Sequence, residues 1–208
     1  SRLVRVGFVT QLVWRRYGRF WLELVRGAAL EAVVARPAAV KERWPDAEKA
    51  GVPTVAFRLA AAQALALSDC DVILVPMLLP ETDVLRGAGQ DPWVADFPAP
   101  LRSSLPALPP LQGVPSWFDA SVESRAVAFL RSFVRDPASV RRVLGRVRPH
   151  ARPERREPPP PVRRQGVPTV AVIGRPWVVN ERLASAVEGE GENLVWQHDL
   201  DEGELRAE

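Results

Sequence analysis

The stretch Asp-Val-Ile-Leu-Val-Pro at residues 71–76 decides the fold of this chain. It is a continuous apolar run of strand length, without the polar alternation of a strand that faces water on one side. Both faces of such a strand have to be covered, and helices are the usual cover. The run therefore predicts a buried strand in a parallel sheet.

The segments before this strand alternate between two patterns. Residues 3–10 and 31–35 are strand-like. Residues 14–27 carry apolar side chains every three or four positions before a glycine, and residues 55–67 also have a helical composition. Strands that alternate with helices predict right-handed parallel crossovers. We therefore expect an α/β fold with helices on both faces of a parallel sheet.

The chain after residue 76 predicts a less regular region. Residues 79–118 are rich in proline and turn residues, so we expect a long loop with at most one short helix. A helix should follow to residue 134, with Asp119 and Ser121 as candidate N-caps. A second helix should cover residues 137–147, with proline in its first turn. Together, residues 1–147 form the predicted first domain.

A proline- and arginine-rich linker is predicted over residues 148–167, where four consecutive prolines favour an extended spacer. Beyond it, residues 169–174 and 193–197 predict strands, and residues 180–187 a helix. We therefore expect residues 168–208 to form a partial second β–α–β unit with an acidic tail. This second lobe is small or truncated, because about forty residues are marginal as an independent domain.

The composition bounds the class of protein. Of the 208 residues, 47% are hydrophobic and 25% charged, which is typical of a globular protein. The longest apolar stretch has about nine residues, whereas a membrane-spanning helix needs roughly 20. We predict no membrane segment. The absence of a signal-peptide pattern and the presence of a single cysteine favour a cytoplasmic location.

Charge is segregated along the chain although the net charge is only +3. Residues 141–164 hold nine arginines against two glutamates, and residues 188–208 hold eight acidic residues and one arginine. Arginine-rich stretches bind phosphates or nucleic acid. We interpret this one as a solvated linker and do not expect nucleic acid as a partner, because no aromatic side chains for base stacking stand between the arginines.

Four short blocks resemble the 2-hydroxyacyl-CoA dehydratase subunits and the related proteins associated with the dehydratase activases. The blocks are Val-Gly-Phe-Val-Thr-Gln-Leu-Val-Trp at residues 6–14 with Phe-Trp at 20–21, Asp-Val-Ile-Leu-Val-Pro at 71–76, Asp-Pro-Trp-Val at 91–94 with proline at 98, and Val-Ile-Gly-Arg-Pro-Trp at 172–177. Their order and spacing fit the family across nearly the whole chain. The resemblance implies flavodoxin-like (Rossmann-like) lobes in a cytoplasmic subunit.

In the dehydratases of this family, cysteines from these turns ligate a [4Fe–4S] cluster that an ATP-hydrolysing activator reduces. This chain departs from the family at those turns. Asp91 stands where the family has a cysteine, residues 52–57 hold none, and Thr10 and Gln11 replace a Pro-Arg pair. A cluster needs about four protein thiolates, or three with an open site. Cys70 alone predicts no metal and no cofactor, and we interpret it as a small apolar core residue.

Other catalytic constellations are missing from the sequence. It has no nucleophile elbow, no phosphate-binding loop of the Gly-x-x-x-x-Gly-Lys-Ser/Thr type and no dinucleotide fingerprint. His150 lies at the edge of the linker, and His198 lies among acidic residues of the tail. We interpret that tail as a solvated face. The sequence therefore predicts no catalytic residue. It leaves enzymatic activity open and favours a protein that is not an enzyme.

One ligand site is predicted. Ligands of open parallel sheets bind outside the carboxyl ends of the strands, and those ends carry Thr10, Gln11, Pro76, Glu81 and Arg175. Asp91, in the turn of the third block, is a further candidate. Arg175 next to a helix start is suited to an anion such as a CoA or other phosphate. The alternative is that Arg175 belongs to a packing turn.

Three functions are compatible with the sequence. The leading one is a cluster-less relative of the dehydratase and activase-associated subunits, non-catalytic, which acts by binding or by assembly with a protein partner or with itself. The second is a small-molecule-binding or hydrolytic or lyase-type α/β enzyme that uses the same cleft, with Asp91 or Glu81 as acid or base. The third is an arginine-mediated nucleic-acid binder.

Overall fold

The computed structural model describes residues 2–12, 14–51, 54–77, 96–115, 120–152, 165–172 and 193–196. The chain divides into two compact units, Ser1–Glu154 and Arg155–Glu208. The first unit contains a sheet clad by helices, and the second contains a pair of strands. Each unit is described by itself.

The sheet of the first unit has four parallel strands in the order β2-β1-β3-β4. The strands are β1 (Arg5–Phe8), β2 (Glu31–Val34), β3 (Val72–Met77) and β4 (Leu111–Pro115). The buried run at residues 71–76 accordingly forms a central strand, paired on both sides. The order matches the first four strands of a flavodoxin-like sheet, so the predicted fold class is confirmed.

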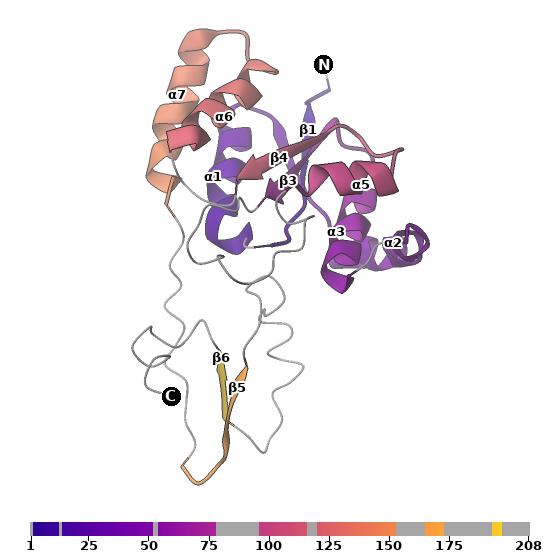
Figure 1. Ribbon diagram of the computed structural model, residues 1–208. Coiled ribbons are helices and arrows are strands. Elements are labelled where there is room, and N and C mark those ends of the chain that lie inside the picture. The colour runs from indigo at the N-terminus through magenta and orange to yellow at the C-terminus, as the bar shows by residue number, and fades with distance from the viewer. Residues whose placement is uncertain are drawn as a thin grey trace. The chain divides into compact units, whose positions relative to one another are not determined.

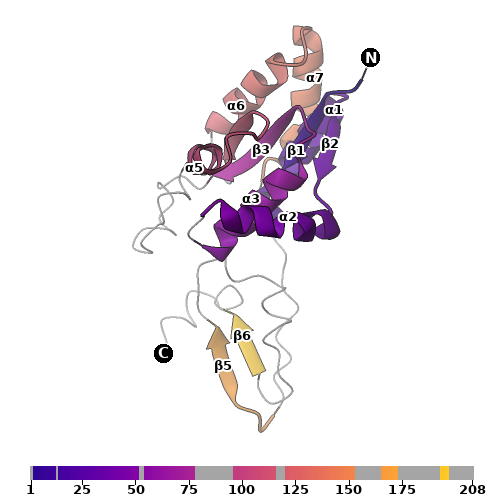
Figure 2. The same cartoon turned by 90° about the vertical axis from the view of Figure 1, so that its right-hand side faces the viewer.

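Helices cover both faces of this sheet. On one side lie α1 (Trp14–Gly27), α6 (Ala120–Arg131) and α7 (Pro137–Val147), followed by a 3₁₀ turn at Arg148–His150. On the other lie α2 (Pro37–Lys49), α3 (Val55–Ala66) and α5 (Pro98–Ser104). Figure 1 shows these two groups on the left and right of the strands, and Figure 2 shows α2 beside α3. None of the described helices combines the length and apolar character that a membrane crossing requires.

The larger core lies between the sheet and the first group of helices. Val6 and Phe8 alternate along β1 towards this face, as the two-residue period of a strand requires. Across from them, Trp21 and Leu24 of α1 and Phe129 of α6 are fully buried. The helix pattern read from residues 14–27 therefore marks the face of α1 that the sheet covers.

The opposite face of the sheet is packed against α3 and α5. Gly7 is tightly packed here, because a Cβ atom would lie 3.2 Å from the Sγ atom of Cys70 and 3.2 Å from Leu67. Phe57 of α3 and Phe97 at the start of α5 lie with ring centroids 5.2 Å apart. The glycine in β1 lets the end of α3 approach the sheet closely.

The segment expected as a long loop contains more structure than predicted. Within its described part, residues 96–115, the short helix α5 agrees with the prediction, but β4 does not. Two prolines precede β4, Pro115 is its last residue and Gly113 lies inside it, so its local sequence is typical of a turn. It forms a strand because it pairs with β3 at the edge of the described sheet, where proline is tolerated.

The second unit contains β5 (Thr169–Val172) and β6 (Asn193–Trp196), which pair in parallel. Both strands were expected. The buried side chain of Asn193 donates from its Nδ2 atom to the carbonyl oxygen of Val167 at 3.1 Å. The helix predicted at residues 180–187 lies outside the described residues.

Candidate functional site

The carboxyl ends of β1 and β3 meet where the connections of the sheet diverge. From β1 the chain passes through α1 to β2 on one side, whereas β3 on the other side is reached through α2 and α3 on the opposite face. Ligands of doubly wound sheets bind at this point. We call it the carboxyl edge, formed by Thr10, Gln11 and Leu12 after β1 and by Met77 at the end of β3.

Thr10 is held at the carboxyl edge by a buried amide. Its backbone N–H donates to Oε1 of Gln63 at 3.1 Å, and Nε2 of Gln63 donates to its hydroxyl oxygen at 3.0 Å. Gln63 comes from α3 and is 9% exposed. Because the Thr10 hydroxyl is used here as an acceptor, its own proton remains able to donate to an oxygen of a ligand.

The turn from β1 into α1 adopts a conformation that is uncommon for a residue other than glycine. Leu12 has a φ angle of 54°, and the N–H of Trp14 donates to its carbonyl oxygen at 2.8 Å. The Trp14 ring packs against Phe8, with ring centroids 5.2 Å apart, and against Gly18 one turn along the helix. These contacts fix the point at which the chain leaves the sheet.

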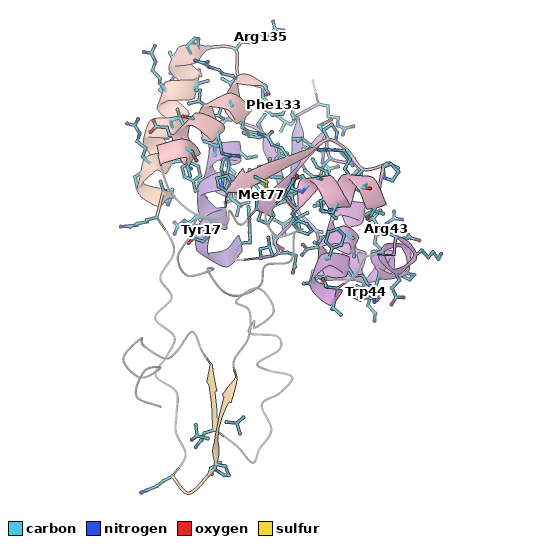
Figure 3. All side chains as sticks on the ribbon, viewed as in Figure 1. Tyr17, Arg43, Trp44, Met77, Phe133 and Arg135 are labelled. Atoms are coloured by element: carbon cyan, nitrogen blue, oxygen red, sulfur yellow. The ribbon has the colours of Figure 1, made fainter. Side chains whose placement is uncertain are left out.

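The neighbouring part of the carboxyl edge is apolar. Met77 ends β3 and lies against Gly113 of β4, where a Cβ atom would come within 2.3 Å of the Met77 Sδ atom. Figure 3 labels Met77 and, on α1, Tyr17, which lies towards the same end of the first unit. The described carboxyl edge therefore carries the hydroxyl group of Thr10 and the thioether of Met77.

Of the predicted ligand-binding residues, Thr10 and Gln11 lie at the carboxyl edge, and their role in binding stays a prediction. Glu81, Asp91 and Arg175 lie outside the described residues, so their roles stay predictions. The sequence analysis missed Gln63. Its signal was an isolated amide within an alanine-rich, largely apolar helical run.

Cys70 lies at the opposite end of the sheet. It immediately precedes β3, is 6% exposed, and donates its N–H to the carbonyl oxygen of Leu67 at 3.0 Å. Burial disfavours the thiolate and raises the pKa of the thiol to about 11, although Arg5 partly opposes this shift. A cysteine that remains a thiol is a poor nucleophile and a poor metal ligand.

Charged residues around Cys70 link the strands to one another. Arg5 donates to the carboxylate of Asp69, which lowers the pKa of Asp69, and its Nε atom lies 3.3 Å from Glu31 on β2. The backbone N–H of Arg5 donates to the carboxylate of Asp71 at 2.7 Å. These contacts join the starts of β1, β2 and β3, which form the amino edge of the sheet. The amino edge therefore has a structural role.

The residues of this chain do not fit an iron–sulfur cluster. Its single cysteine is buried at the amino edge, and the six residues of β3 separate it from the carboxyl edge, a length of roughly 20 Å. In the described part of the chain, no three His, Cys, Asp or Glu side chains are grouped so that they could hold a metal ion. A thiolate cannot reach the carboxyl edge from Cys70.

Comparisons of the chain with protein-family models, with curated proteins and with solved structures find no match.

Proposed function

We propose that this chain is a non-catalytic, cytoplasmic binding subunit related to the 2-hydroxyacyl-CoA dehydratase subunits. It holds a CoA-like or phosphate ligand at the carboxyl edge and works in an assembly with a protein partner or further copies of itself. It carries no cluster of its own. The observation that carries the proposal is the position of Cys70, buried at the amino edge of a flavodoxin-like sheet.

In a cluster-bearing subunit, the ligand-binding position and the cluster thiolates lie together. In this chain they lie apart, because Cys70 is at the amino edge. The scaffold keeps the diverging connections at which flavodoxin-like sheets bind ligands. The sulfur atom lies against Gly7 of β1 instead. The proposed ligand position therefore lies on an edge of the sheet that has no thiolate to support redox chemistry.

Thr10 supports binding of a ligand that carries oxygen acceptors. A hydroxyl proton that is fixed in place and partly removed from water is a good donor to a phosphate or carbonyl oxygen. Gln63 holds Thr10 through two hydrogen bonds, one to its backbone and one to its hydroxyl group. A ligand would therefore meet a donor that is already ordered.

Anaerobic reconstitution with iron and sulfide tests the cluster-less part of the proposal. We expect the purified chain to retain no stoichiometric iron and to show no charge-transfer absorption. The Cys70→Ser variant should give the same result as the unmodified chain. Stoichiometric iron that Cys70→Ser abolishes would overturn this part.

Calorimetry with a 2-hydroxyacyl-CoA thioester tests the binding part. Thr10→Val should weaken binding about tenfold or more, the usual worth of a hydrogen bond to a charged group. Ser124→Ala, which removes an exposed hydroxyl from α6, is the matched control and should bind like the unmodified chain. Equal affinity of the Thr10→Val variant, or no binding by the unmodified chain, would contradict the ligand site. Turnover of the thioester would instead favour an enzyme.

A further inference from the structure

The hairpin formed by α6 and α7 concentrates the positive charge of the first unit. Residues 120–152 hold eight arginines, two acidic residues and no lysine, in a chain whose net charge is +3. Seven of these arginines are exposed: Arg131, Arg135, Arg141, Arg142, Arg146, Arg148 and Arg152. Part of the charge that the sequence analysis assigned to a linker therefore belongs to a folded surface.

Helix α7 has two distinct faces. Its apolar face is buried in the core against α1 and α6: Val140, Val143, Leu144 and Val147. The opposite face exposes Arg141, Arg142, Gly145 and Arg146, which we call the arginine face. Figure 1 shows α7 as the outermost helix on its side of the first unit. Because the apolar face is already covered, α7 cannot insert into lipid as a basic amphipathic helix does.

Each of the two acidic residues of the hairpin pairs with one arginine of the hairpin. Asp136 accepts two backbone N–H groups at the start of α7 and lies 3.8 Å from Arg142. Glu123 pairs with Arg148. Within the described residues, Arg141 and Arg146 have no acidic partner. In addition, Arg142 and Arg146 are four residues apart on the helix, a spacing at which like charges repel.

Nothing in the fold of the described residues explains why position 145 is a glycine. It lies in the interior of α7, where glycine is unfavourable, and a Cβ atom there would meet nothing within 4 Å. The position is exposed and lies between the arginines. A glycine at such a place lets another backbone approach the helix closely.

We propose that the arginine face binds the phosphate backbone of a nucleic-acid duplex. The arginines supply charge-assisted hydrogen bonds to phosphate oxygens, and Gly145 lets the backbone lie against α7. A duplex fits better than a single strand, because the aromatic residues of the hairpin, Phe129 and Phe133, pack on each other with ring centroids 5.2 Å apart. They are thus not available to stack on bases. Contacts of this kind read no sequence.

Anisotropy titrations of a short duplex DNA with the full chain at several salt concentrations test the proposal. The charge variant is Arg141→Gln combined with Arg146→Gln. Each lost phosphate contact should lower the salt slope by about one. The unmodified chain should therefore lose roughly tenfold more affinity than the variant between about 50 and 200 mM salt.

A control variant removes the same charge elsewhere. Arg26→Gln combined with Arg43→Gln changes exposed arginines that pair with Glu23 and Asp46 on their own helices. It should leave the salt slope unchanged. A control that lowers the slope as much as the charge variant would overturn the proposal. So would a lack of duplex binding at low salt, tighter binding of a single strand of equal length, or binding to anionic vesicles but not to the duplex.

Gly145→Gln tests the close approach separately from charge. Glutamine is neutral and favourable in helices, and the open space around Gly145 lets the variant fold, which circular dichroism can verify. We expect several-fold weaker duplex binding with an unchanged salt slope. Unchanged affinity would show that the duplex does not lie against α7.

Discussion

Gln63 and Thr10 are joined by two reciprocal hydrogen bonds, at 3.1 Å from the Thr10 N–H and 3.0 Å to the Thr10 hydroxyl. Gln63→Leu keeps the approximate volume but leaves the Thr10 N–H without its acceptor. A buried donor without a partner costs about 1–3 kcal/mol. We expect the free energy of unfolding, measured with urea, to fall by that amount.

The neighbouring Gln11→Leu variant is the control for this prediction. Gln11 lies in the same turn, but its side chain makes no hydrogen bond to the described residues. The same change there should alter stability by less than about 0.5 kcal/mol. Equal losses in the two variants would mean that the Gln63 amide does not hold Thr10.

Gly18 and Gly145 should respond oppositely to alanine. Both lie inside helices, where alanine is normally more stable than glycine by about 1 kcal/mol. Gly145→Ala should be stabilising by about 0.5–1 kcal/mol, because its Cβ would meet nothing. At Gly18 a Cβ would lie 2.2 Å from the Trp14 ring, so Gly18→Ala must displace that ring and should destabilise by about 1–3 kcal/mol.

Thermal unfolding of the two alanine variants measures this contrast. The double variant of Gly18→Ala with Trp14→Ala supplies the control. Once the ring is removed, alanine at position 18 should be favourable, as it is in an ordinary helix. If Gly18→Ala stabilises the chain containing Trp14, the packing of that ring against α1 is not as described.

Cys70 should make stability sensitive to alkaline pH. The thiol ionises near pH 9 when exposed, whereas its pKa in the folded chain is about 11. The contribution of the buried thiol is complete below pH 9 and is lost as the pH rises through 11, because the unfolded chain releases its proton first. Unfolding in urea across this range should show a steeper decline for the unmodified chain than for Cys70→Ala. Parallel declines would contradict a buried neutral thiol.

Helices α1 and α7 could be predicted closely, and α2 could not. Helices α1 and α7 begin and end where their apolar periodicity places them, because each buries one continuous stripe. In α2, only Val40 and Ala47 are buried, and Pro45 lies inside the helix. Such a helix carries little apolar periodicity, so tertiary packing has to decide its structure.

The same distinction applies to the carboxyl edge. Thr10 and Gln11 could be placed there because their position follows from the end of β1 in the chain. Gln63 could not be assigned to this edge from sequence, because its contact with Thr10 spans 53 residues and depends on how α3 crosses the sheet. Side chains that support a site from another element are visible only once the elements are packed.

Asp136 should make α7 sensitive to acid. Its carboxylate accepts from the N–H groups of Ala138 and Ser139 at 3.1 and 2.9 Å and from the Ser139 hydroxyl at 2.6 Å. The Ser139 hydroxyl and these N–H groups lower the pKa of Asp136. The stabilisation is present above pH 3.8, the usual value for this group, and is lost as the pH falls through the lowered pKa.

Two substitutions separate capping from charge at this position. Asp136→Asn keeps an acceptor oxygen for the N–H groups, so thermal stability at neutral pH should change little and its decline in acid should be shallower. Asp136→Ala removes the cap and should destabilise α7 at neutral pH as well. If the asparagine variant declines in acid as steeply as the unmodified chain, the carboxylate of Asp136 is not the group that titrates. Both substitutions remove the same negative charge near Arg142, so Asp136→Asn, which also keeps the cap of α7, should strengthen duplex binding.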